Sequence, residues 1–189
     1  MKYAYSLATI RPWTRHMKHR SPTQQRQKAN TKLLNLKRLL DQGEAFMHKN
    51  DFQAASELYA EAVMKFPDQS ISYSCLGAAL IKLEKMNDAE TVLRHALELN
   101  PNDELARTNI ASIYQYNGEN KEALMNCLEL IQINPHSAVA FNNLGCALSA
   151  LEMYDEAKAA HQTSLEINEN YTDNLINLGK IYSDACEPD

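Results

Sequence analysis

The sequence predicts an all-α protein, an α-solenoid of about four helix–turn–helix repeats followed by one more helix. Three observations support this fold class. A proline recurs every 34 residues, at Pro67, Pro101 and Pro135. Four of the five glycines share one place in the same period, and alanines share another. A fixed period in this range is the signature of stacked helical repeats, which bury their apolar faces against one another.

The small residues indicate how the two helices of each repeat approach each other. The units begin at Leu36, Ser70, Glu104 and Ala138, with a partial fifth unit from Thr172. The eighth position of successive units is Gly43, Gly77, Ala111, Gly145 and Gly179, and the twentieth is Ala55, Ala89, Ala123 and Ala157. A glycine inside a helix costs about 1 kcal/mol relative to alanine. This cost is tolerated where a neighbouring backbone comes close, so we expect two tightly packed antiparallel helices in each unit.

The first part of the chain differs from the rest in charge. Residues 1–40 carry ten Lys and Arg and no acidic residue, a charge of +10, whereas residues 41–189 carry −15. We expect residues 1–32 to form a flexible basic arm with a helical C-terminal part, because Ser21-Pro22 is typical of a helix start. A disordered tail is the simplest interpretation of residues 1–20. A targeting sequence, or an arm for nucleic acid or an acidic lipid surface, is the alternative.

The repeat domain is expected over residues 33–186, as units 36–69, 70–103, 104–137 and 138–171 and a half unit 172–186. Each unit splits into a first and a second helix. The expected pairs are Leu36–Lys49 with Phe52–Lys65, Ile71–Leu83 with Asn87–Leu99, Leu105–Tyr116 with Lys121–Ile133, and Val139–Leu151 with Asp155–Ile167. Gly118 suits a left-handed turn between two helices.

The last helix, from Asp173 to about Ala185, has no second helix after it in this sequence. Its polar residues Asp173, Asn177 and Lys180 could cap the stack, since terminal repeats usually carry a polar face. The alternatives are a homo-oligomer formed through this C-terminal helix and a lost C-terminal domain.

The composition, with 44% hydrophobic residues, suits one helical domain. No run of about 18 apolar residues occurs, so we expect no membrane span. Four cysteines lie far apart in the sequence, at Cys75, Cys127, Cys146 and Cys186. We interpret them as reduced thiols in a cytoplasmic protein, without the paired spacing of a metal site. No cofactor, phosphate-binding loop or catalytic constellation is expected, and the protein is predicted not to be an enzyme.

The units resemble the tetratricopeptide repeat, which has 34 residues, small residues at positions eight, twenty and twenty-seven, and proline at thirty-two. The resemblance covers residues 36–171 as four units and half a unit beyond them. It implies a right-handed superhelix that serves as a scaffold for other proteins. The sequence departs from the family pattern at Gln42 and Leu130, and at the usually large twenty-fourth position, where Cys127 and His161 stand. We expect looser local packing there, with His161 as a core or edge histidine.

The first helices of a stack line its concave side, and one stripe of their residues is polar but nearly uncharged. Position six of units three to five is Asn109, Asn143 and Asn177, which we call the asparagine row. Amide side chains both donate and accept hydrogen bonds, so such a row can hold the main chain of an extended peptide. The row is similar to the asparagine ladder of O-GlcNAc transferase repeat domains. The alternative is that these amides bond locally within the stack.

The candidate peptide-binding residues are Asn109, Asn143, Asn177, Asn142, Thr108, Ser112, Tyr116, Cys146 and Lys180. The carboxylate clamp by which some family members grip chaperone tails is excluded, because its basic residues are absent at Ser74, Thr108 and Val139.

Three functions compete. The favoured one is a non-enzymatic interaction scaffold that binds an extended segment of a protein partner in its concave groove. The second is the substrate-docking repeat region of a larger or associated glycosyltransferase-like enzyme. The third places the function in the basic arm, which would bind nucleic acid or another polyanion with strong salt dependence.

Overall fold

A computed structural model describes residues 21–184 of the chain. This range consists of helices joined by short turns, with no strand in it. The chain divides into two compact parts, residues 1–35 and residues 36–189, and the second part contains all the repeat units. The candidate site lies entirely in this second part. The expectations for residues 1–20, for Cys186 and for the end of the chain fall outside the described residues.

Helix α1 (Pro22–His48) begins where the sequence predicts. The hydroxyl of Ser21 accepts a hydrogen bond from the backbone N–H of Gln24, at 3.3 Å, and the Gln24 side chain accepts one from the Ser21 N–H, at 3.1 Å. These reciprocal bonds form a capping box, which satisfies two donors at the open helix end. The first helix of unit one therefore extends N-terminally, as expected.

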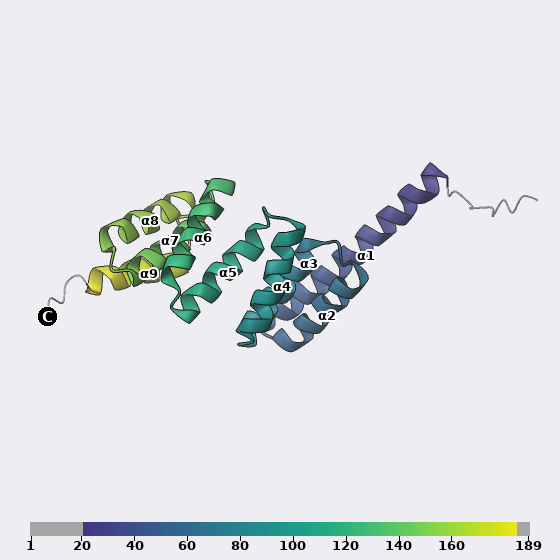
Figure 1. Cartoon of the computed structure of the whole chain (residues 1–189), viewed down its shortest axis with the longest axis horizontal. Coiled ribbons are helices and arrows are strands. Elements are labelled where there is room, and N and C mark those ends of the chain that lie inside the picture. The colour runs from purple at the N-terminus through teal and green to yellow at the C-terminus, as the bar shows by residue number, and fades with distance from the viewer. Residues whose placement is uncertain (1–20, 185–189) are drawn as a thin grey trace, which may run out of the picture. The chain divides into compact units, whose positions relative to one another are not determined.

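The other helices follow the predicted pairs to within one residue at nearly every end. They are α2 (Phe52–Lys65), α3 (Ser70–Lys82), α4 (Met86–Leu99), α5 (Glu104–Asn117), α6 (Asn120–Ile133), α7 (Ala138–Ala150), α8 (Tyr154–Ile167) and α9 (Thr172–Asp184). In Figure 1 the second helices α4, α6 and α8 lie beside the first helices α3, α5 and α7 that precede them. The first helices α3, α5, α7 and α9 also contact one another in sequence.

The turn between the two helices of each unit has the same backbone geometry at position fifteen. Asn50, Glu84, Gly118 and Glu152 all have a positive φ, between 57° and 74°. Gly118 adopts the left-handed conformation predicted for it and ends α5. The two glutamates occupy this conformation although side chains with a Cβ disfavour it by about 1–2 kcal/mol. The packing of the two helices in each unit, rather than the residue type at position fifteen, thus determines the left-handed conformation of the turn.

The glycines at position eight make room for a side chain at position twenty-four. A Cβ added to Gly43 would come within 2.3 Å of Tyr59, and one added to Gly77 within 2.5 Å of Leu93. At Gly145 it would come within 2.6 Å of His161. In the third unit the pair is Ala111 and Cys127, both fully buried. A larger residue at position eight is therefore matched by a smaller one at position twenty-four.

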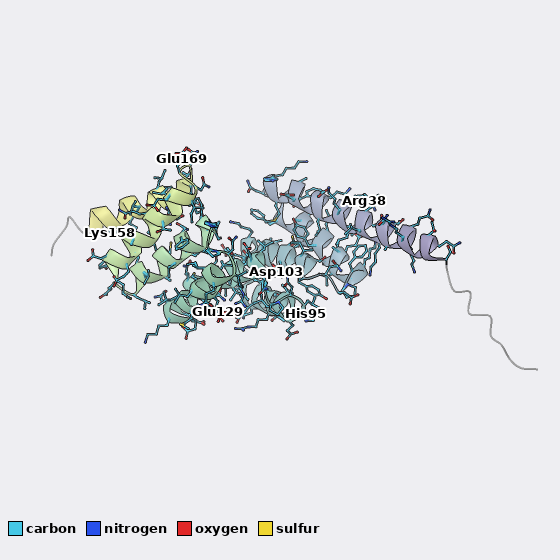
Figure 2. The ribbon with its side chains drawn as sticks, turned by 90° about the horizontal axis from the view of Figure 1, so that it is seen from above. Arg38, His95, Asp103, Glu129, Lys158 and Glu169 are labelled. Atoms are coloured by element: carbon cyan, nitrogen blue, oxygen red, sulfur yellow. The ribbon has the colours of Figure 1, made fainter. Side chains whose placement is uncertain are left out.

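Side chains at position thirty-four cap two of the first helices. Asp103 accepts a hydrogen bond from the Ala106 N–H, at 3.1 Å, and Ser137 accepts one from the Ala140 N–H, at 3.3 Å. Asp103 is buried and also accepts a bond of 3.0 Å from the hydroxyl of Ser74, which ties the start of α5 to α3. Figure 2 labels Asp103 among the side chains of these helices. Its burial is stabilised because both carboxylate oxygens have donors.

The last helix leaves its packing position empty. Among the residues that the structure describes, nothing lies within 4 Å of a Cβ added to Gly179, whereas Gly145 one unit earlier is covered. Leu175 and Ile176 on the same helix are 50% and 65% exposed. The expectation that Asn177 belongs to an outward polar cap is wrong, because its amide bonds to α7. The exposed part of α9 thus combines the polar residues Asp173 and Lys180, as the cap prediction expects, with the apolar side chains of Leu175 and Ile176.

Candidate functional site on the first helices

We define the first-helix face as positions two, five, six, nine, twelve and thirteen of the first helices. On α5 and α7 this face carries no charged side chain. The second helices differ, because ion pairs such as Arg94–Glu90 and Lys65–Glu61 line their exposed sides. Other charged residues, including Glu129 and Glu169 in Figure 2, are exposed as well. A helix face exposed only to water is usually charged, so the neutral face is suited to contact a partner.

Two members of the asparagine row form a local hydrogen-bond cluster. The Asn177 amide donates to Asn142 Oδ1 at 3.1 Å and to the sulfur of Cys146 at 3.3 Å. The Asn142 amide in turn donates to Asn143 Oδ1 at 3.4 Å. Asn142 and Asn143 are buried, with 6% and 8% exposure. These contacts join α7 to α9, as the alternative interpretation of the row expects.

The third member of the row has an unsatisfied donor. The Asn109 Nδ2 atom is shielded from water and has no acceptor among the residues that the structure describes. The residue as a whole is half-buried, one unit before the cluster. A buried donor without a partner costs about 1–3 kcal/mol, a cost that an incoming acceptor would relieve. Asn109 is therefore the one member of the row whose amide nitrogen has no acceptor among the described residues, and a main-chain carbonyl would reach it once the side chain turns towards the groove.

The remaining predicted residues are spread along the same face. Thr108 and Ser112 are half-buried, and the Ser112 hydroxyl donates to the Thr108 carbonyl at 3.2 Å. Tyr116 is 68% exposed, and Lys180 is exposed. The structure thus groups Asn142, Asn143, Asn177 and Cys146 at the contact of α7 with α9. It places Thr108, Asn109, Ser112 and Tyr116 along α5.

An apolar stripe accompanies the asparagine row. Ile71, Leu105 and Val139 all stand at position two, and they are 38%, 38% and 39% exposed. Ile71 and Leu105 also line a hollow of about 340 Å³ with Leu40, Met47 and Ala78, among other residues of α1, α2 and α3. The sequence contains this signal as a hydrophobic residue repeated at one register position. Register alone does not identify it as part of a site, because position two also faces the stack.

A second cavity, of about 290 Å³, lies between α7, α8 and α9. Its lining contains three predicted residues, Cys146, Asn177 and Lys180. The other described lining residues are Ser149, Ala150, Tyr154, His161 and Ile181. Ala150, Tyr154 and Lys180 are exposed, whereas His161 and Ile181 are buried. The cavity therefore runs from an exposed rim on the first-helix face to a buried histidine.

His161 is held by reciprocal contacts with Asn174 on α9. The Asn174 amide donates to the His161 carbonyl at 2.7 Å, and its Oδ1 faces His161 Nδ1 within hydrogen-bond reach. Burial lowers the pKa of His161, and the hydrogen bond with Asn174 opposes this in part. The other ring nitrogen, Nε2, is buried and has no partner within the described range. The sequence predicts a core or edge position for His161 but gives no sign of this orphan atom.

The cysteines on and near the face are unreactive by environment. Burial raises the pKa of the Cys75 thiol to about 11 and that of Cys127 to about 12, and it also raises the pKa of Cys146. The thiolate is the nucleophile and the metal ligand, so these thiols are poorly suited to either role. Within residues 21–184 the structure brings together no three His, Cys, Asp or Glu side chains that could hold a metal ion.

Comparison with known proteins places the chain among helical-repeat proteins. Two family models, both described as tetratricopeptide repeat, match residues 72–103 and 103–170, which together are just over half of the chain. A solved structure, the protein TTC0263 of Thermus thermophilus, has a TM-score of 0.74 at 17% identity, over 80% of this chain and 83% of that one. At that identity the likeness shows the fold alone.

Two other similar proteins share more sequence. The structure of YrrB, described as a TPR protein with an unusual peptide-binding site, is 26% identical, with a TM-score of 0.59 over 70% of this chain and 69% of that one. The human protein O-mannosyl-transferase TMTC3 is 28% identical over 152 residues, 78% of this chain. The chain spans 17% of the length of that relative, so this likeness concerns the repeats.

Proposed function

Since the chain belongs to the tetratricopeptide repeat family, whose helical stack serves as a scaffold, we propose that it is a non-enzymatic scaffold that binds an extended peptide segment of a partner protein along its first-helix face. The observation that carries the proposal is the buried, unpaired donor of Asn109 on an uncharged face, within the residues that the structure describes.

The two kinds of residue on this face suit the two parts of a peptide. The Asn109 amide would donate to a main-chain carbonyl, which every peptide has whatever its sequence. The apolar stripe of Ile71, Leu105 and Val139 would bury side chains of the partner, and burial stabilises by about 25 cal/mol per Å² of apolar surface. The unusual peptide-binding site of YrrB supports this proposal, since that protein shares the repeat fold.

The test uses peptides selected on the full chain from a random display library, with affinities measured by calorimetry. Asn109→Ala is expected to weaken them about tenfold, because it removes one hydrogen bond in a shielded place. The matched control is Asn126→Ala. Asn126 on α6 is also half-buried and has an amide oxygen without a donor in the described residues, but it lies on a second helix. An equal loss of peptide affinity in both variants, or no loss of affinity in either, would refute the proposal.

The glycosyltransferase alternative is not favoured. Its support is the likeness to TMTC3, which covers 17% of that protein and concerns the repeats rather than transferase chemistry. A homo-oligomer through α9 stays a prediction, and sedimentation velocity of Leu175→Lys against the unchanged chain would test it. In residues 21–184 the longest apolar stretch of any helix is too short or too polar to cross a bilayer.

A further inference from the structure

The hydrogen bonds of His161 determine which of its nitrogens carries the proton. The Asn174 amide nitrogen donates to the His161 main-chain carbonyl at 2.7 Å, so the other amide atom, Oδ1, must be the one that faces the ring. An amide oxygen only accepts, so Nδ1 is the donor. Neutral imidazole has one N–H, which leaves Nε2 as an acceptor with a free lone pair. The buried surroundings favour this neutral form.

The free acceptor belongs to a residue that lines an open cavity. The His161 side chain is 0% exposed, and its Nε2 receives no hydrogen bond from any described residue. The same ring lines the cavity of about 290 Å³ between α7, α8 and α9. Its face covers Gly145, because an added Cβ there would be equally far, 2.6 Å, from Cδ2, Cε1 and Nε2. This contact uses a face of the ring and leaves free the edge that carries the lone pair. Because Nε2 is shielded in this structure, a ligand in the cavity would reach it when a neighbouring lining side chain shifts.

The other lining residues restrict what could enter. Lys180 at the exposed rim offers a cationic donor, and Asn177 beside it already gives its amide protons to Asn142 and Cys146. Ala150 and Ile181 supply apolar walls. A group that donates to His161 and accepts from Lys180 must carry both functions, as a carboxamide or a hydroxyl does. A carboxylate has no proton for Nε2, and an aliphatic side chain leaves both groups unpaired.

We propose that this cavity is a specificity pocket for one neutral polar side chain of the bound peptide, a carboxamide or hydroxyl that donates to His161 Nε2. The pocket opens on the first-helix face beside the asparagine row, so it deepens the proposed function and rests on it. Its volume of about 290 Å³ is well above that of a single water and accommodates a glutamine or tyrosine side chain.

The first test needs no natural partner. The full chain, labelled with ¹⁵N in its histidines, is titrated with propionamide and, separately, with propionate, which has the same size but no N–H. Propionamide is expected to shift the His161 Nε2 resonance saturably, and propionate is not. His48, His95 and His136 are exposed and serve as internal controls. Equal shifts with both probes, or none with propionamide, would overturn the proposal.

The second test separates this proposal from the proposed function. His161→Leu keeps a large apolar residue at position twenty-four, as Leu93 does in unit two, but removes the acceptor. Library peptides should be selected with Gln, Asn, Ser, Thr or Tyr at one fixed position, and His161→Leu should weaken them about tenfold. If binding depends on Asn109 but not on His161, the pocket is refuted and the scaffold function stands. If propionamide reaches His161 but no peptide depends on Asn109, the scaffold function fails.

Discussion

The pairing of positions eight and twenty-four predicts that two damaging substitutions will partly cancel. Gly77→Ala would place a Cβ 2.5 Å from two atoms of Leu93. Overpacking of this kind costs about 1–3 kcal/mol, from which about 1 kcal/mol is recovered because alanine favours the helix. Leu93 is fully buried, and Leu93→Cys alone should cost about 2 kcal/mol or more through the cavity that it leaves.

The double variant Gly77→Ala/Leu93→Cys gives unit two the same pair that unit three has in Ala111 and Cys127. The new Cβ then occupies space that the shorter side chain vacates. We expect the double variant to be more stable than the sum of the single effects by about 1–3 kcal/mol, the size of couplings between residues in contact. Urea unfolding followed by helical circular dichroism measures all four free energies of unfolding.

The control is Gly179→Ala, at the same register position but with no described residue within 4 Å of the added Cβ. It should raise the free energy of unfolding by about 1 kcal/mol, the helix-propensity gain alone. The reasoning is refuted if Gly77→Ala stabilises the protein as Gly179→Ala does, or if the two changes in unit two are simply additive.

Three further predictions concern the turn, a cap and the buried histidine. Glu152→Gly should raise the free energy of unfolding by about 1 kcal/mol, because glycine adopts the positive φ of 62° without strain. Gly118→Ala should lower it by a similar amount, because it places a Cβ at a positive φ of 74°. Thermal unfolding of both variants tests the two effects. Asp103→Ala should lower the free energy of unfolding in urea by about 2 kcal/mol, because it removes both a helix cap and the hydrogen bond from Ser74 on α3. Ser137→Ala removes a cap alone and should lower it by about 1 kcal/mol. The lowered pKa of His161 means that the unfolded chain binds more protons, so stability is complete above about pH 6.5 and falls below it, by up to about 1.4 kcal/mol per pH unit. Urea unfolding from pH 7.5 to 5 should show this fall in the unchanged chain and a smaller one in His161→Leu.

The sequence predicted the helices well because their ends are marked by local chemistry. Pro22 and Gly118 each act within one turn of their own position, and each stands where it was expected. Register alone also identified the glycines of position eight. These features depend on backbone geometry that repeats every 34 residues. The same pattern therefore occurs in four units, and each occurrence supports the same prediction.

The chemistry of the site was less accessible from the sequence. Asn109, Asn143 and Asn177 look equivalent in register. Within the described range, however, the Asn109 amide nitrogen has no acceptor, whereas Asn143 and Asn177 lie in a hydrogen-bond cluster. The difference comes from Asn142 beside Asn143, and from the side-chain rotamers at the contact of α7 with α9. The free nitrogen of His161 depends on Asn174, thirteen residues away, through an amide orientation that no pattern encodes.

The small pair in unit three affects how the array comes apart. In a repeat protein each unit contacts only its neighbours, so stability is a sum of unit and interface terms rather than a property of one core. Ala111 with Cys127 buries less side chain between α5 and α6 than Gly77 with Leu93 buries between α3 and α4. Of these two units, unit three therefore has the contact that contributes less apolar burial to the free energy of unfolding. If the array opens first at the contact of α5 with α6, the blocks on either side retain their helices, and Asn109 belongs to α5, one of the two helices of that contact. A peptide bound along the first-helix face, as proposed, would contact both blocks. It would therefore couple their unfolding into one cooperative transition.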